Sequence, residues 1–256
     1  MKFVVVSLLI LLIRAGSAGL IVPWESFGYL PGEDALSGGL GGFATTSPAT
    51  SANTDIVAGS LRYTDSAGNS LVTADNSALV DGADETATVS NIKPISLSAV
   101  AGNTLWLSFV GQQTAGTNAR FFNLGLRGPD NTIQPPDSNN TSDEILAIGM
   151  PTASSAETSP TPPQQWRIWD RTTGGAGWNY SISNTPTTQV SFLLVKIELN
   201  AVDTRERYTL WVNPRLDLAP DPAEGFSFVS TDSDFAAWIN ITELRLGAGN
   251  STTAPL

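Results

Sequence analysis

The stretch "SFLLVKIELNAVDTRERYTLWVNP" (residues 191–214) alternates apolar and polar residues on both sides of a short charged break. Such period-two alternation predicts β-strands, because successive side chains of a strand point to opposite faces. Residues 200–206 are short and polar enough to close an antiparallel hairpin, and Pro214 ends the pairing because it has no amide hydrogen. We expect both strands in the middle of a sheet, with one side buried against a second sheet. The side expected to be buried comprises Leu193, Val195, Ile197 and Leu199.

The whole chain has the composition of a protein built from many antiparallel strands. Of its 256 residues 41% are hydrophobic and only 14% are charged, while 23 glycines and 16 prolines supply frequent turns. Strand-like segments recur at short intervals, which favours an all-β antiparallel sandwich of two stacked sheets over a parallel α/β fold. Long surface loops are expected at residues 129–143 and 151–165, which are rich in Pro, Ser, Thr and Asn. Further strands are predicted at residues 58–64, 69–74, 85–92, 103–112, 119–128, 144–150, 165–171, 226–230 and 236–246.

The N-terminal sequence "MKFVVVSLLILLIRAGSAG" has the layout of a secretory signal peptide, with a lysine, an apolar run and small residues ending near Ala18. The apolar run is too short for an easy bilayer span. Arg14 is unusual at this position of a signal peptide, so an uncleaved membrane anchor is the alternative. The mature chain is therefore expected to have no membrane span and to be secreted, extracellular or held in the cell envelope. The expected division is a signal peptide at 1–18, a single domain at 19–247 and a polar tail at 248–256.

Charge and residue usage exclude several classes of function. The formal net charge of −11 argues against nucleic acid as a partner, because binding there depends on Lys and Arg that neutralise phosphates. The chain has no cysteine, which excludes disulfides, thiol catalysis and thiolate metal sites. It has no histidine either, which excludes a Ser-His-Asp triad and imidazole-ligated zinc.

A succession of strand-like segments within residues 24–247 carries a family resemblance, and three segments are its most specific parts. They are "FLLVKIELN" (192–200), the following "LWVNP" (210–214) and the closing "ELRLG" (243–247). They resemble exported, planctomycete-like bacterial proteins with a concanavalin A-like lectin/glucanase domain of the LamG type. The resemblance covers most of residues 24–247 and implies an antiparallel jelly-roll β-sandwich. That fold hosts both glycosidases and sugar-binding modules, so function has to be argued from the site.

No catalytic residues are assigned, and the chain is not expected to be an enzyme. Laminarinase-like members of the family place their carboxylates on one strand as Glu-x-Asp-x-x-Glu, so that two of them flank the scissile bond. This chain has no such pattern. Its acidic clusters lie beside Gly, Pro or Ser in turn-like sequence, which favours solvated loop charge.

A cofactor is not expected, and a structural calcium ion is the one metal left open. Calcium takes oxygen ligands, which Asp, Asn and backbone carbonyls of loops can supply. The densest such segments are "DNSALVDGADE" (75–85) and "STDSDF" (230–235). Neither follows the ligand spacing of an EF-hand loop.

A carbohydrate site is predicted around "WRIWDR" (166–171) and "GGAGWNY" (174–180). An exposed aromatic ring can stack on a sugar, and amide or carboxylate groups beside it can fix the hydroxyls. The alternative is ordinary packing of these aromatic rings between two sheets. Three further tryptophans, Trp106, Trp211 and Trp238, lie within strand patterns and are weaker candidates. The predicted site comprises Trp169, Asp170, Arg171, Trp178 and Asn179.

The function favoured by these observations is that of an exported, non-catalytic module that binds polysaccharide, a cell-surface glycan or another component of the cell envelope. One alternative is a structural or adhesive envelope protein without a small-molecule site. The other is a divergent glycoside hydrolase whose carboxylates are scattered in sequence.

Overall fold

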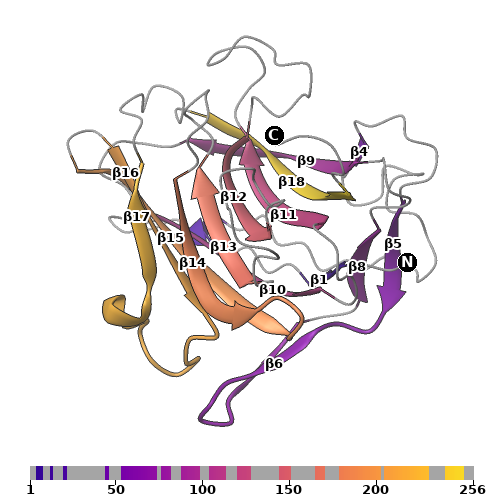
Figure 1. Ribbon diagram of the computed structural model, residues 1–256, viewed down its shortest axis with the longest axis horizontal. Helices are drawn as coiled ribbons and strands as arrows, with labels where there is room; N and C mark the ends of the chain where they lie inside the picture. Colours follow the sequence, from indigo (N-terminus) through magenta and orange to yellow (C-terminus); the bar gives the residue numbers. More distant parts are fainter. Residues whose placement is uncertain are drawn as a thin grey trace.

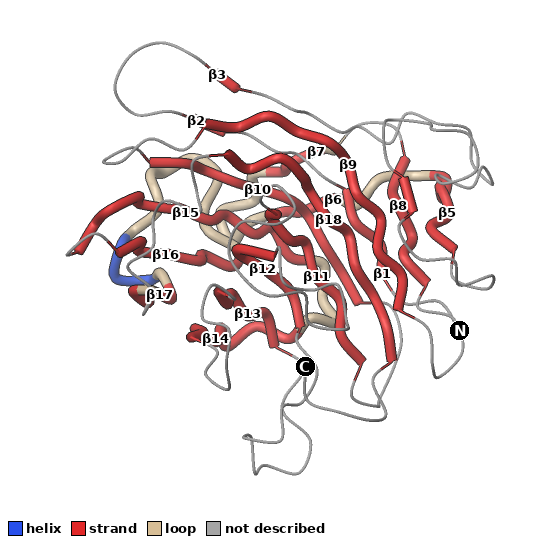
Figure 2. Tube along the Cα trace, turned by 90° about the horizontal axis from the view of Figure 1, so that it is seen from above, coloured by secondary structure: helices blue, strands red, loops and turns tan. Residues whose placement is uncertain are grey.

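The computed structural model describes residues 4–7, 12–13, 20–21, 44–45, 53–73, 76–81, 88–98, 104–113, 120–127, 144–150, 165–170, 179–202, 205–230 and 240–250. Within these ranges the regular structure is β-strand, apart from the single 3-10 turn η2 (Pro222–Glu224), which Figure 2 shows beside β16 and β17. The strand pairs of these ranges are all antiparallel. The predicted all-β, antiparallel class is therefore confirmed.

Two sheets of seven strands each make up the body of the molecule (Figure 1). The first sheet has the order β17 (Phe226–Val229), β16 (Arg205–Val212), β15 (Ser191–Val202), β10 (Thr104–Gln113), β1 (Val4–Ser7), β8 (Asn76–Asp81) and β5 (Asn53–Ala58). The second has the order β14 (Asn179–Pro186), β13 (Gln165–Asp170), β12 (Glu144–Met150), β11 (Arg120–Arg127), β18 (Asn240–Asn250), β9 (Thr88–Ser98) and β4 (Ala44–Thr45). Two small pairs complete the described strands: β2 (Leu12–Ile13) with β3 (Leu20–Ile21), and β6 (Arg62–Thr64) with β7 (Ser70–Val72).

The hairpin of β15 and β16 lies inside the first sheet, as the alternation predicted. β15 pairs with β10 on one side and with β16 on the other, and β16 pairs further with β17. Its four apolar alternate residues are buried, and burying each such side chain contributes roughly 1.5–3 kcal/mol. Their exposed fractions are 0% for Leu193, Val195 and Ile197 and 2% for Leu199.

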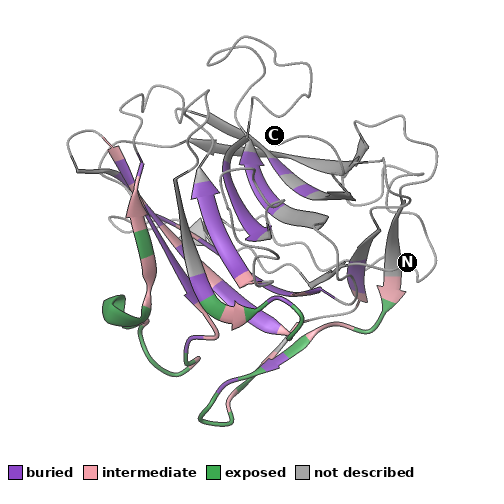
Figure 3. Cartoon of the chain, viewed as in Figure 1, coloured by how far each residue is buried: buried purple, intermediate pink, exposed green. Residues whose placement is uncertain are grey.

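The inner faces of the two sheets contact each other through large aromatic side chains. Phe109 of β10 meets Trp166 of β13 edge to face, with ring centroids 6.2 Å apart and an interplanar angle of 74°. A Cβ on Gly111 would lie 3.0 Å from the Trp166 ring, so a residue without a side chain lets the ring approach β10. Figure 3 shows buried residues along the strands of both sheets and exposed ones on η2 and the β6–β7 hairpin. The core therefore lies between the two sheets.

Several predicted element boundaries are wrong, and backbone geometry explains the clearest case. Residues 58–64 were expected to be one strand, but Gly59 adopts φ +88° and separates β5 of the first sheet from the small β6–β7 pair. A positive φ is readily accessible to glycine and ends an extended run. The break between β15 and β16 is shorter than the expected 200–206, because the strands reach Val202 and resume at Arg205. The strands β8 and β14 were not predicted.

The two ends of the chain contain strands that the expected domain limits did not include. β1 lies within the segment predicted to be a signal peptide and pairs with both β10 and β8. β18 continues past residue 247, the expected end of the domain, to Asn250. The predicted loops at 129–143 and 151–165 lie outside the described residues, apart from Gln165, which begins β13. In the part of the chain that is described, no helix has the length and apolar character needed to cross a bilayer.

Candidate functional site

The predicted carbohydrate site is only partly among the residues whose side chains the structure describes. Trp169 of β13 is 2% exposed, which is at odds with an exposed stacking surface, although it lies on the face of β13 opposite to Trp166 and so is not shown to pack between the two sheets. The strand register places Asp170 directly opposite Asn179, so the structure brings these two positions together. Arg171 and Trp178 lie outside the described residues, and the side chains of Asp170 and Asn179 are not described. For these four residues a sugar-binding role stays a prediction.

The strand that carries Trp169 is buried on both of its faces. β13 is an interior strand, with β12 and β14 on its two sides. Its alternate residues Trp166 and Ile168 are 0% exposed, and Arg167 on the same side as Trp169 is only 5% exposed. Both faces of β13 are therefore covered, and alternation along one strand does not reveal this.

A half-buried tryptophan does lie on the outer face of the first sheet. Trp106 of β10 alternates with the buried core residues Leu105 and Leu107, so it points away from the second sheet. The register places it opposite Lys196 of β15. On the far side of β15, Trp211 of β16 lies opposite Leu194 and shares the same outer face.

The two indoles of this face meet above β15. Trp106 and Trp211 are stacked, with ring centroids 5.7 Å apart and an interplanar angle of 22°. Trp211 is 4% exposed, and its Nε1 donates a hydrogen bond to the carbonyl oxygen of Asp221 at 2.7 Å. A Cβ on Gly225 would lie 3.0 Å from the Trp211 ring, so the backbone beyond η2 packs directly on it. Trp211 is thus held by its hydrogen bond and by backbone packing, and it stacks against the more accessible Trp106.

Charged groups lie beside this aromatic pair. Lys196 Nζ lies 2.8 Å from Glu198 Oε1, and the two side chains are 29% and 27% exposed. The same Nζ is 5.9 Å from the centroid of the Trp106 ring, at the outer limit of a cation–π contact. We call Trp106, Trp211, Lys196 and Glu198 the Trp106 platform. It combines an aromatic surface with a hydrogen-bond donor and an acceptor, which are the groups that hold a sugar ring and its hydroxyls.

A neighbouring part of this outer face is covered by the β6–β7 hairpin. Tyr63 of β6 is 5% exposed and packs on Phe192 of β15, with ring centroids 5.7 Å apart. Val110 of β10 completes this buried cluster, and Leu61 and Leu71 of the hairpin pack around it. The Tyr63 hydroxyl donates to the carbonyl oxygen of Pro214 at 3.3 Å. The hairpin therefore forms an apolar cover next to the Trp106 platform.

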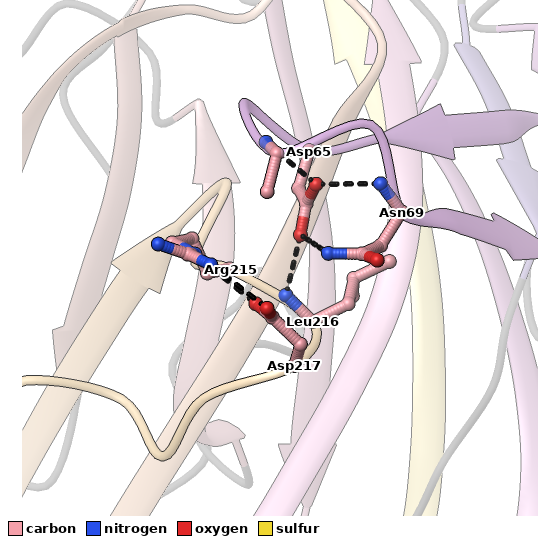
Figure 4. Close-up of polar contacts among 6 residues, drawn as sticks. Asp65, Asn69, Arg215, Leu216 and Asp217 are labelled. Carbon is pink, nitrogen blue, oxygen red and sulfur yellow. Dashed lines mark hydrogen bonds and ion pairs between the residues drawn. The ribbon is translucent and has the colours of Figure 1, made fainter.

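Asp65 anchors this cover to the loop that follows β16 (Figure 4). Its Oδ2 accepts the Leu216 amide at 2.8 Å and the Asn69 side-chain amide at 3.0 Å. Its Oδ1 accepts the backbone amides of Asn69 at 2.8 Å and Ala67 at 2.9 Å. The carboxylate thus closes the hairpin turn and ties it to a segment far away in sequence.

The hydrogen bonds to Asp65 favour its ionised form. The Leu216 amide is the largest influence, and with the donors of Asn69 and Ala67 it lowers the pKa of Asp65 to about 2, against an opposing effect of desolvation. Nearby, the side chain of Arg215 donates to Asp217 at 3.0 and 2.8 Å and lowers the pKa of that carboxyl. Burial, and then the charge of Asp65, raise the pKa of Tyr63. The shifts of Asp65 and Tyr63 reflect the hydrogen bonds and the burial at the hairpin contact.

Among the described residues, no group of three or more His, Cys, Asp or Glu side chains is placed so that it could hold a metal ion. Residues 76–81 of one calcium candidate form β8, in which Ser77 and Ala78 are buried. Of the other candidate only Ser230 is described. Calcium at these two segments stays a prediction.

Comparison with known protein families, with curated proteins and with solved structures finds no match for this chain. The choice of site therefore depends on the geometry of the described residues. Among the predicted aromatic candidates, that geometry favours Trp106 over Trp169.

Proposed function

We propose that the chain is an exported, non-catalytic jelly-roll β-sandwich of the concanavalin A-like kind, which binds carbohydrate outside the cell through the Trp106 platform. The export and the fold family are supported by the signal-like N-terminal sequence and by the resemblance of residues 192–200, 210–214 and 243–247. Two facing antiparallel sheets are compatible with that fold. Carbohydrate is the ligand class that best suits an aromatic ring flanked by a donor and an acceptor.

One observation carries the choice of site. Trp106 is half-buried, its ring is backed by the buried Trp211, and the ion pair of Lys196 and Glu198 lies next to it. A ring held in this way loses little side-chain freedom when a ligand stacks on it, because its orientation is already set by packing. The Trp169 indole offers no comparable surface, since it is buried.

A binding role suits the platform better than hydrolysis. A glycosidase needs two carboxyl groups that flank the scissile bond, one of them able to act as an acid. Within the platform the carboxylate is Glu198, and it is paired with Lys196 at 2.8 Å. The chain also has no Glu-x-Asp-x-x-Glu segment.

The test is a binding screen of the purified chain on soluble and immobilised polysaccharides, with Trp106→Ala as the principal variant. We expect saturable binding that falls at least about tenfold in Trp106→Ala, which corresponds to about 1.4 kcal/mol, while Trp106→Phe keeps part of it. Leu218→Ala is the control, because it removes an apolar side chain that is 57% exposed and lies outside the platform. Thermal unfolding of each variant shows whether lost binding comes from lost structure.

Two results would contradict the proposal in different ways. Absence of binding to every polysaccharide would favour a structural or adhesive envelope role. Release of reducing ends from a polysaccharide, abolished by Glu198→Gln, would make the chain a glycoside hydrolase.

A further inference from the structure

Positive and negative side chains are equal in number on and next to the Trp106 platform. This balance limits the charge of the sugars that the platform can bind. On the outer face of the described strands around it, Lys196, Arg205 and Arg207 are cationic and Glu198 is anionic, while Glu206 of β16 is 1% exposed and alternates to the inner side. The η2 turn beside Trp211 adds the exposed Asp221 and Glu224. Three positive side chains therefore accompany three negative ones on or next to the platform.

The strand register mixes these charges at short range. Lys196 and Glu198 form a direct ion pair, and Glu198 lies opposite Arg207 on β16. A polyanion that approaches Lys196 also meets the carboxylate of Glu198. The chain as a whole has a net charge of −11, which repels polyanions at distances up to about the Debye length of 10 Å in 0.1 M salt.

The ion pair has hydrogen-bonding capacity beyond its own contact. An ammonium group has three donors, and a carboxylate has about four acceptor positions, so each group can hold further partners. A pair of neighbouring sugar hydroxyls can accept from Lys196 and donate to Glu198 at the same time, because a hydroxyl does both. Both side chains are within reach of solvent, at 29% and 27% exposed.

From these observations we infer that the Trp106 platform selects neutral polysaccharides, with a pyranose ring stacked on Trp106 and two neighbouring hydroxyls held by Lys196 and Glu198. The inference rests on the proposed carbohydrate-binding function and adds the ligand class. Polysaccharides that carry carboxylates or sulfates are disfavoured, because the platform offers them no net positive charge and the chain repels them.

The experiment compares neutral and acidic polymers in the same titration. Dextran, mannan and hydroxyethylcellulose serve as neutral probes, and polygalacturonate and dextran sulfate as acidic probes that separate carboxylate from sulfate. We expect at least one neutral polymer to bind at least about tenfold more tightly than either acidic one, with less than about a twofold change between 50 and 300 mM NaCl.

Variants of the ion pair test the role of its two members. Lys196→Gln and Glu198→Gln should each weaken binding of the neutral polymer about tenfold, since each removes a charged hydrogen-bonding group. The exchanged variant Lys196→Glu/Glu198→Lys restores both a donor and an acceptor and should recover part of the affinity. Arg62→Gln is the control, because Arg62 is exposed on the β6–β7 hairpin and outside the platform.

The outcomes separate this inference from the function on which it rests. Tighter binding of an acidic polymer, with a steep loss of affinity in salt, would overturn the neutral class and leave carbohydrate binding in place. Binding of a neutral polymer that is unchanged in both single variants of the pair would also overturn it. Failure of every polymer to bind would remove the proposed function itself.

Discussion

The outer face of the first sheet has one region that is covered by another segment and one region that stays accessible to solvent. In one, Phe192 and Val110 are covered by Tyr63 of the β6–β7 hairpin and are 9% and 0% exposed. In the other, the side chains of Lys196 and Glu198 remain 29% and 27% exposed beside Trp106. Both regions belong to the same strands, β10 and β15, and to the same face of those strands.

The difference shows that exposure on this face is decided by the segments that fold over it. The hairpin is held in place by Tyr63 and by the hydrogen bond of Asp65 to the Leu216 amide in the loop after β16. Where it ends, polar and aromatic residues of the sheet become accessible. The cover and the Trp106 platform are therefore two parts of one arrangement, and the following variants test them in order of expected effect.

The largest change in the free energy of unfolding is expected for a substitution on the inner face. It serves as the reference for substitutions in the two outer regions. Val195→Asp places a carboxylate at a position that is 0% exposed, and we expect a loss of about 4 kcal/mol or more in the free energy of unfolding. Lys196→Gln, one residue further on the outer face, should cost less than about 1 kcal/mol. Urea denaturation measures both, and comparable stability of the two variants would contradict the assigned faces.

The next effect concerns the cover. Tyr63→Ala removes a ring that is 5% exposed and leaves Phe192 and Val110 uncovered, so we expect a loss of about 3 kcal/mol. Tyr63→Phe keeps the ring and loses only the 3.3 Å hydrogen bond to Pro214, at a cost of about 1 kcal/mol. Chemical denaturation gives the two values, and dye binding reports the exposed apolar surface. Equal losses in both variants would mean that the hydrogen bond, and not the ring, holds the cover.

A smaller effect is expected behind the Trp106 platform. A Cβ at Gly225 would lie 2.5 Å from Thr209 Cγ2 and 3.0 Å from the Trp211 ring, so Gly225→Ala should cost about 1–3 kcal/mol by overpacking. The displaced Trp211 should also weaken the stacking with Trp106, which near-ultraviolet circular dichroism can follow. Adding Thr209→Ser removes the closer methyl group and should restore part of the stability. No recovery in the double variant would assign the strain elsewhere.

The smallest effect is expected in acid, at the anchor of the cover. The pKa of Asp65 is lowered from 3.8 to about 2, so the folded state favours its ionised form. Its contribution to stability is therefore complete above about pH 4 and is lost as the pH falls through about 2. The thermal midpoint should drop less steeply over this interval in Asp65→Asn than in the unchanged chain. Asp217, whose pKa Arg215 also lowers, contributes to the dependence that remains.

The pH profile has a clear contrary result. Parallel curves for the two proteins between pH 4 and pH 2 would show that Asp65 does not link the hairpin to the loop after β16. Faster hydrogen exchange at the Leu216 amide in Asp65→Asn is the matching local measurement.

The sequence by itself determined the strand type and the inner face of the central hairpin. Alternation along a strand is a local property, because each side chain takes its face from its neighbours in the chain. Residues 191–214 therefore sufficed to predict adjacent antiparallel strands with Val195 and Ile197 buried, and the structure confirms both. The end of a strand at Gly59 could not be predicted in the same way, since the positive φ there depends on the path that the chain follows in the folded protein.

Only the tertiary structure decided which tryptophan is accessible. Trp106 and Trp169 both lie in strand patterns, yet the first is half-buried beside Lys196 and the second is 2% exposed. The surroundings of Trp106 are set by contacts that join β10 to β15 and Trp106 to Trp211, beside the part of the outer face that the β6–β7 hairpin covers. All of these contacts link residues that are distant in sequence. The register that aligns the strands follows from the packing of the whole sheet and not from any one strand.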